Sequence, residues 1–147
     1  MQVEKITNKD FLRNILIEYA SNCKREAWPV LADKMQNNIF LDWERIFVAT
    51  EDDRIIWFCT FTKEDWIPGC DYSPFVWFIF VDSSYRWKRI SEKMIIAVQK
   101  YAKSLGFEKL YIVSDHKGLY EKYWFKKCDE MVDEMWRVES IFYRKIE

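Results

Sequence analysis

The stretch that decides the fold runs from Pro74 to Val113 and reads PFVWFIFVDSSYRWKRISEKMIIAVQKYAKSLGFEKLYIV. Its opening apolar run, Pro74–Val81, is typical of a strand buried on both faces. The apolar run Lys109–Val113 predicts a second strand. Between the two strands, apolar residues recur at helical spacing: Met94, Ile95, Val98, Tyr101, Ala102 and Leu105. Gly106 follows them, where the end of a helix needs a residue in the left-handed conformation. Strand, helix and strand in this order predict a parallel pair joined by a right-handed crossover.

The flanking sequence extends this unit to a whole fold. Arg45–Thr50 and Arg54–Thr62 flank an acidic turn and predict a β-hairpin. The other expected elements are a first strand over 1–6, helices over 7–23 and 29–38, a short helix at 119–123 and a closing strand at 137–146. The expected fold class is therefore α/β, with a mixed, mostly antiparallel sheet that contains one parallel βαβ unit, flanked by about four helices. We expect a single domain over residues 1–147.

Composition excludes several functional classes. Half of the 147 residues are hydrophobic, so disorder is not expected. A net charge of −1 argues against binding of nucleic acid or membranes through the overall charge of the protein. No signal-peptide pattern and no apolar run of membrane-spanning length appear. Four widely spaced cysteines form no metal-binding pattern and predict free thiols in a reducing cytoplasm.

A basic, aromatic loop lies between the apolar run and the helix. Arg86, Lys88 and Arg89 lead into a helix N-terminus, where unpaired N–H groups and the helix dipole favour anions. This combination favours a pyrophosphate site, and a solvated basic loop is the alternative interpretation. A nucleic-acid surface is a third interpretation, which the near-neutral net charge and the single basic loop disfavour.

At these residues the sequence resembles the GNAT acetyltransferase superfamily. That family carries an Arg/Gln-x-x-Gly-x-Gly/Ala loop between its fourth strand and third helix, and Arg86–Ser91 stands at the same place. FVDSSYR (Phe80–Arg86) is similar to the family's strand exit, and LYEKYWF (Leu119–Phe125) to its LYEKxGF element. The resemblance covers residues 45–128 well.

The resemblance implies an N-acetyltransferase that moves an acetyl group from acetyl-CoA to an amine by direct attack, without a metal. It implies that backbone N–H groups of Phe80 and Val81 bind the cofactor. It assigns the cofactor's pyrophosphate to the loop residues Arg86, Trp87, Lys88, Arg89, Ile90 and Ser91. Trp87, Arg89, Ser91 and Trp124 replace family glycines, so side-chain charge is expected to supplement backbone contacts. A non-catalytic acyl-CoA-binding or regulatory module is the alternative that these replacements motivate.

The resemblance assigns the general acid to Tyr120, whose phenol would protonate the departing thiolate, with Tyr123 as a weaker substitute. The general base stays open between His116, Glu64, Asp65 and water. The acidic stretch Asp129–Glu134 either attracts a cationic acceptor or forms a solvated turn, which we favour. Trp28, Trp57, Trp66 and Trp136 either line an acceptor pocket or belong to the core. The expected partner is a small-molecule or peptide amine, and exposed aromatics favour a homodimer.

Overall fold

A computed structural model gives the architecture of the chain. It describes residues 2–6, 41–52, 54–63, 67, 69–85, 90–114, 118, 120–133 and 136–146. The helices expected over 7–23 and 29–38 lie outside these residues, as does the acidic residue that closes the chain. Within the described part, no helix has the length and apolar character needed to cross a membrane.

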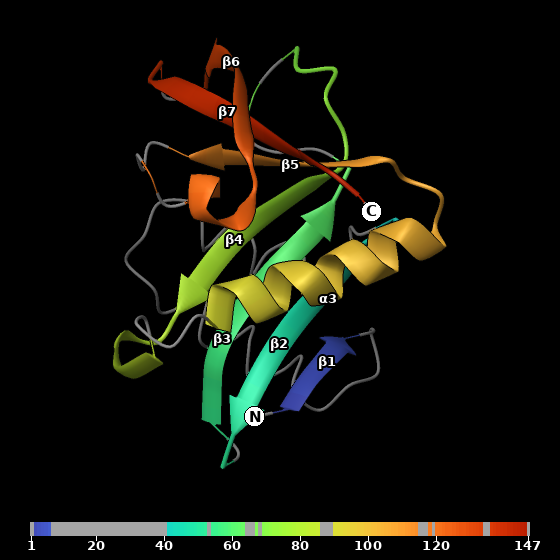
Figure 1. Cartoon of the computed structure of the whole chain (residues 1–147), viewed down its shortest axis with the longest axis vertical. Coiled ribbons are helices and arrows are strands. Elements are labelled where there is room, and N and C mark those ends of the chain that lie inside the picture. The colour runs from blue at the N-terminus through green and yellow to red at the C-terminus, as the bar shows by residue number, and fades with distance from the viewer. Residues whose placement is uncertain are drawn as a thin grey trace.

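One twisted sheet of seven strands organises the described residues, in the order β1-β2-β3-β4-β5-β7-β6 (Figure 1). Every neighbouring pair is antiparallel except β4 and β5, which are parallel. The mixed sheet and its single parallel pair confirm the expected fold class. The strands are β1 (Gln2–Ile6), β2 (Arg45–Glu51), β3 (Arg54–Thr62), β4 (Phe75–Val81), β5 (Lys109–Ser114), β6 (Lys126–Val132) and β7 (Val138–Lys145).

The helix α3 (Ile90–Ser104) connects the two parallel strands, as predicted. Its buried side is formed by Ile90, Met94, Ile95, Val98 and Ala102. Gly106 has a φ of 88°, and its N–H and that of Phe107 donate to the carbonyls of Lys103 and Ala102 at 3.0 and 3.1 Å. This is a Schellman cap. The prediction was wrong for Leu105, which is exposed because it follows the last helical residue and points away from the sheet-facing side.

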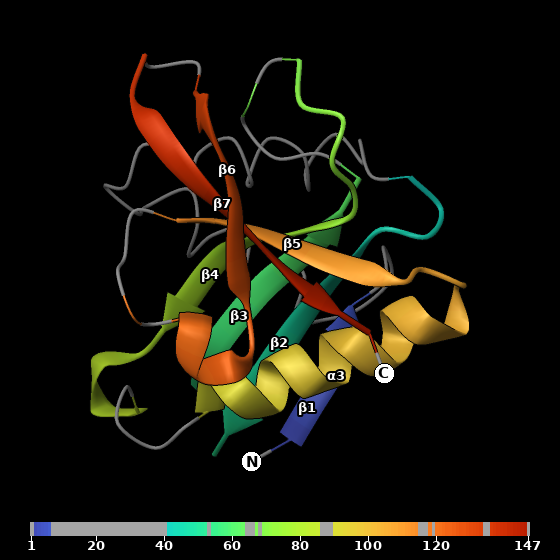
Figure 2. The same cartoon turned by 45° about the horizontal axis from the view of Figure 1, so that its top comes forward.

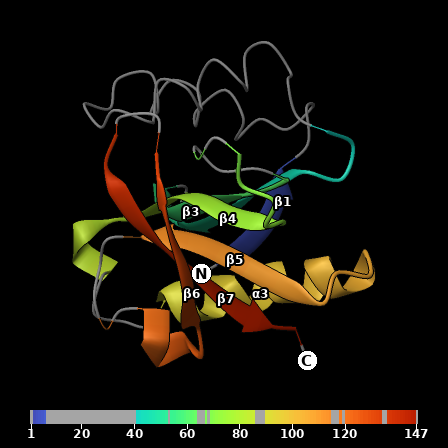
Figure 3. The same cartoon turned by 90° about the horizontal axis from the view of Figure 1, so that it is seen from above.

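Two apolar clusters cover the two faces of the sheet. Figure 3 shows α3 lying along one face. The larger cluster packs on that side and includes Phe47, Trp57, Met94, Val98, Leu110 and Phe142. The smaller one, on the opposite face, consists of Ile67, Phe75 and Ile141, with half-buried Tyr72 and Tyr111 against it. Phe75 and Val76 belong to different clusters, which agrees with a β4 that is buried on both faces at its start.

A bulge in β4 separates this strand from β5. Between the pairs Phe58↔Phe80 and Thr60↔Trp77, one residue of β3 faces two residues of β4, Phe78 and Ile79. Such an extra residue bends its strand and increases its twist. Accordingly, β4 and β5 share the single register pair Phe75↔Tyr111 and then diverge toward their carboxyl ends (Figure 1). We call this divergence the split.

The hairpin prediction is confirmed and the prediction for the acidic stretch is wrong in part. The strands β2 and β3 flank a tight turn in which Asp52 has a φ of 52°. Asp129–Val132, expected as a solvated turn, instead continues the edge strand β6. Its charged residues are poor strand formers in isolation, but pairing with β7 overrides that preference. Because β6 lies at the edge of the sheet, its charge also discourages pairing with strands of other chains.

Candidate functional site

The split is the candidate site, because four elements meet at its open end. The carboxyl ends of β4 and β5 form its two sides. The short 3₁₀ helix η1 (Ser83–Tyr85) follows β4, and a second, η2 (Tyr120–Tyr123), lies beside the first turn of α3 (Figures 1 and 2). The position agrees with the rule that ligands bind beyond the carboxyl ends of parallel strands.

The backbone of β4 presents hydrogen-bonding groups to the split. The N–H of Asp82 donates to the Ile56 carbonyl of β3 at 2.8 Å. Successive residues of a strand direct their N–H and C=O groups to opposite sides. Phe80, in register with Phe58, therefore points its backbone groups to β3, whereas Val81 points its own toward the split. Of the two strand residues implied by the resemblance, Val81 has the suitable backbone direction.

The first turn of α3 is anchored to the core through Ser91. Trp57, on β3, is fully buried, and its Nε1–H donates to the Ser91 Oγ at 3.2 Å. Ile90 is buried beside it in the larger cluster. The Ser91 hydroxyl thus accepts a hydrogen bond from the core. Trp57 belongs to the core and not to an acceptor pocket. The four residues Arg86–Arg89 lie outside the described part.

Tyr120 is the first residue of η2 and is 7% exposed. Its ring contacts Phe125 edge-on at 6.2 Å between centroids and Phe142 at 6.4 Å. Tyr123, three residues later, is 9% exposed and belongs to the same cluster. Both rings therefore contribute to the core.

The acidic stretch has structural partners on the opposite face. The Tyr72 hydroxyl donates to Asp129 Oδ2 at 2.9 Å, and this bond to a carboxylate raises the pKa of Tyr72 to about 12. Tyr72 stacks on Tyr111, with 5.0 Å between ring centroids. Asp133 is buried and accepts the Arg137 N–H at 3.0 Å, which closes the turn between β6 and β7. Asp133 thus organises the hairpin and does not face an acceptor as a solvated charge.

The remaining tryptophan and general-base candidates fall into two groups, those that the structure describes and those that it does not. Trp136 is 89% exposed at the β6–β7 turn, whereas Trp28, Trp66 and the base candidates His116, Glu64 and Asp65 lie outside the described residues. Among the described side chains, no group of three or more His, Cys, Asp or Glu is arranged to hold a metal ion. Cys59, Cys70 and Cys128 are free thiols, and burial raises the pKa of the Cys59 thiol well above its usual value.

Solved structures share this fold over nearly their whole length. An aminoglycoside 6'-N-acetyltransferase complexed with coenzyme A has a TM-score of 0.75 at 12% identity, covering 100% of this chain and 98% of that one. The aminoglycoside 6'-N-acetyltransferase from Enterococcus faecium has a TM-score of 0.77 at 14% identity, with the same coverage. An N-acetyltransferase from Staphylococcus aureus Mu50 gives 0.66 at 18% identity, covering 99% and 98%. No curated protein sequence matches the chain significantly.

The sequence model of the acetyltransferase (GNAT) family matches residues 10–125, which is most of the chain. The chain belongs to the GNAT acetyltransferase family. As a GNAT protein it is an acetyl-CoA-dependent N-acetyltransferase that transfers an acetyl group to an amine. The non-catalytic alternative is not favoured.

Two features of this GNAT site could not be predicted from the sequence. The bulge in β4 falls within the uninterrupted apolar run FVWFIFV, which has no glycine or proline to mark it. The bond from Trp57 to Ser91 joins residues 34 positions apart and has no local pattern. In contrast, the order of the elements and the family resemblance were enough to predict a site at the end of β4, which stays a prediction.

Proposed function

We propose that acetyl-CoA binds in the split, with its thioester between the carboxyl ends of β4 and β5. The observation that supports this most is the loss of pairing after Phe75↔Tyr111, which leaves strand edges available beside the start of α3. The pantetheine arm of the cofactor carries amide groups, which pair well with a strand edge. Acetyl-CoA supplies the activated acetyl group.

Three roles for residues of the chain follow from this pose. The Val81 N–H donates to the thioester carbonyl oxygen, where negative charge develops during transfer. Arg86, Lys88 and Arg89, with the first turn of α3, hold the pyrophosphate. Tyr120 gives its phenolic proton to the departing sulfur, and the base that deprotonates the acceptor ammonium is His116, Glu64, Asp65 or water.

The acceptor in this proposal is a primary amine of a small molecule or a peptide. The aminoglycoside acetyltransferases among the structural relatives make a small polyamine-like acceptor the first class to screen. We place the enzyme, as a single domain, in the reducing cytoplasm, which the free thiols Cys59, Cys70 and Cys128 support. Exposed Val132, Trp136 and Val138 at the end of the β6–β7 hairpin favour a homodimer.

Replacing Tyr120 by Phe tests the catalytic role. The ring and its contacts with Phe125 and Phe142 stay, so the melting temperature and the acetyl-CoA affinity should change little. Loss of a general acid should lower kcat by about 10²–10⁴. The measurement is steady-state kinetics with an acceptor found in an amine screen. Tyr123→Phe is the matched control and should keep the wild-type rate; an unchanged rate in Tyr120→Phe would assign this residue to packing alone.

Replacing Arg86 or Arg89 by Ala tests the loop. Each change removes one charge-assisted contact with the pyrophosphate and should weaken acetyl-CoA binding by about 1.5–3 kcal/mol, measured by calorimetry. Lys103→Ala, on the exposed last turn of α3, is the control and should leave the affinity unchanged. If both arginine variants bind acetyl-CoA as the wild type does, the loop does not hold the pyrophosphate.

A further inference from the structure

The two halves of the sheet meet at a narrow junction. The first half contains β1 to β4, and the second contains β5, β7 and β6. The two are paired through Phe75↔Tyr111, and the Tyr111 N–H donates to the Pro74 carbonyl at 3.0 Å. Two strands that are joined at one point are free to diverge beyond it, and the split lies beyond this point. The contacts around the junction therefore affect the width of the split.

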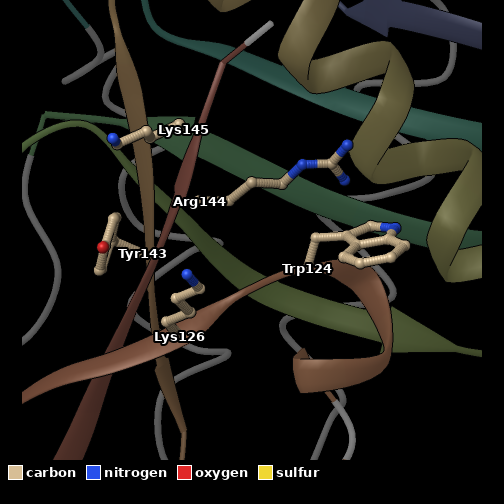
Figure 4. A pocket seen from close by; sticks show the side chains of 5 residues that line it. All are labelled: Trp124, Lys126, Tyr143, Arg144 and Lys145. Carbon is tan, nitrogen blue, oxygen red and sulfur yellow. The ribbon is translucent and has the colours of Figure 1, made fainter.

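The junction has one face toward α3 and one face away from it. Figure 4, a close view of a pocket beside β7, shows how side chains alternate between them: Arg144 points toward α3, and its neighbour Tyr143 points to the other face. Tyr143 is in register with Tyr111 of β5, and residues in register share a face of the sheet. The Tyr111 ring therefore lies on the face away from α3, where it packs against the smaller apolar cluster.

Tyr72 lies on this same face and contacts the second half twice. Its ring stacks on Tyr111 of β5, with 5.0 Å between the centroids and 30° between the ring planes. Its hydroxyl donates to Asp129 Oδ2 of β6 at 2.9 Å. The other oxygen of that carboxylate accepts the Glu130 N–H at 2.8 Å, which fixes the carboxylate. Because the strand order is β4-β5-β7-β6, this side chain links the segment before β4 to the far edge of the second half.

The backbone next to Tyr72 is attached to the first half. The hydroxyl of Ser73 donates to the carbonyl of Lys63, directly after β3, at 2.8 Å. The Lys63 N–H in turn donates at 2.7 Å to the carboxylate of Glu44, a buried residue directly before β2. The segment is thus held by the first half, while the side chain of Tyr72 is held by the second. Such a link resists any change in the angle between the halves.

We propose that Tyr72 is a positioning residue, which braces the two halves of the sheet and so holds the split at the width that acetyl-CoA requires. The inference rests on the proposed binding of the cofactor in the split. A thioester between the ends of β4 and β5 meets the Val81 N–H only at one separation of the strands, and a misplacement of about 1 Å can cost about 10²-fold in rate. Without the brace, only a fraction of the molecules has the required width, and the apparent cofactor affinity falls in proportion to that fraction.

Replacing Tyr72 by Phe tests the brace, because the ring can still stack on Tyr111 while the bond to Asp129 is lost. Calorimetry should show coenzyme A binding that is weaker by about three- to tenfold, which corresponds to the net effect of one hydrogen bond. A second measurement needs no ligand. In the free protein, the Tyr111 amide, which donates to the Pro74 carbonyl across the junction, should exchange its hydrogen faster than in the wild type.

Tyr101→Phe is the matched control. It also removes a bond from a tyrosine hydroxyl, at 2.8 Å to the Trp43 carbonyl, but this bond ties α3 to the residues before β2 and does not reach the second half. The variant should lose stability in urea unfolding as Tyr72→Phe does, yet bind coenzyme A with wild-type affinity.

Asp129 provides an independent test of the same bond. Asp129→Asn keeps an acceptor for the Tyr72 hydroxyl and should retain most of the coenzyme A affinity, whereas Asp129→Ala should weaken binding as much as Tyr72→Phe. Combining Asp129→Ala with Tyr72→Phe should weaken binding no further, because both changes remove one and the same interaction.

Three results would overturn the proposal. The first is wild-type affinity in Tyr72→Phe while coenzyme A still slows exchange at the Val81 amide, because the cofactor site then stands and only the brace fails. The second is an equal loss of affinity in Tyr101→Phe, because general destabilisation would then explain both variants. The third is a wild-type Val81 amide that coenzyme A does not protect, which removes the proposed cofactor site and this inference with it.

Discussion

At the scale of single residues, Ser91 anchors the start of α3 to the core, at a position that the family resemblance assigns to cofactor binding. The family motif has a small residue without a hydroxyl there, whereas Ser91 accepts the indole N–H of the buried Trp57. The departure from the motif is thus explained by a partner in the core. The tryptophan that requires this partner lies on β3, so the loop sequence alone could not indicate it.

Ser91→Gly should destabilise the protein. The buried indole N–H of Trp57 would lose its acceptor, which costs about 1–3 kcal/mol, and the glycine would add a further penalty of roughly 0.5–1 kcal/mol in the helix. Urea unfolding measures the change. Ser91→Thr keeps an oxygen in reach of Trp57 and is the control. A Gly variant as stable as the wild type, with tighter acetyl-CoA binding, would show instead that Ser91 impairs the cofactor site.

Tyr72 should titrate unusually late, because its O–H donates to the Asp129 carboxylate and its pKa is about 12 instead of 10. A group whose folded pKa is raised contributes stability that is complete below pH 10 and is lost as the pH rises through about 12. Asp129→Asn should return the Tyr72 pKa toward 10. Ultraviolet titration follows the phenolate, with Tyr72→Phe identifying its signal, and an unshifted titration in Asp129→Asn would contradict the assignment.

At the scale of elements, strands and helices with regular apolar patterns were predictable. The spacing of Met94, Ile95 and Val98 predicted α3, and Gly106 predicted its end. In contrast, the residues of β6 (Lys126–Val132) do not alternate between apolar and polar, so the sequence shows no apolar face. Only the pairing of β6 with β7 at the edge of the sheet makes it a strand. Long-range pairing therefore set the limit of what the sequence could predict.

The bulge in β4 should make the strand respond to the cofactor. Past the bulge, the Val81 N–H points away from β3 and toward the split, where β5 does not pair with it. Coenzyme A should slow hydrogen exchange at this amide, measured by mass spectrometry or NMR. The amides of β2 that pair with β3 are the control and should exchange equally with and without ligand. Unchanged exchange at Val81 would exclude the strand end from the site.

At the scale of the whole molecule, the sheet consists of two antiparallel halves. One contains β1 to β4 and the other β5, β7 and β6, and their pairing is the single register pair Phe75↔Tyr111. The helix α3 spans the junction and packs against the first half through Met94, Ile95 and Val98, while Leu110 and Phe142 join the same cluster from the second. The topology of this junction followed from the order of elements, whereas its width depends on the bulge and required the structure.

The split also gives the protein two strand edges inside the sheet. Exposed edges invite pairing with strands of other chains, and proteins normally confine them to the outer strands, as charged β6 does here. In the proposed complex, an interior edge cannot be protected by charge without obstructing the cofactor. The cofactor would then act as the missing neighbour strand, and the proposed active site would also be where the empty protein is most open to aggregation.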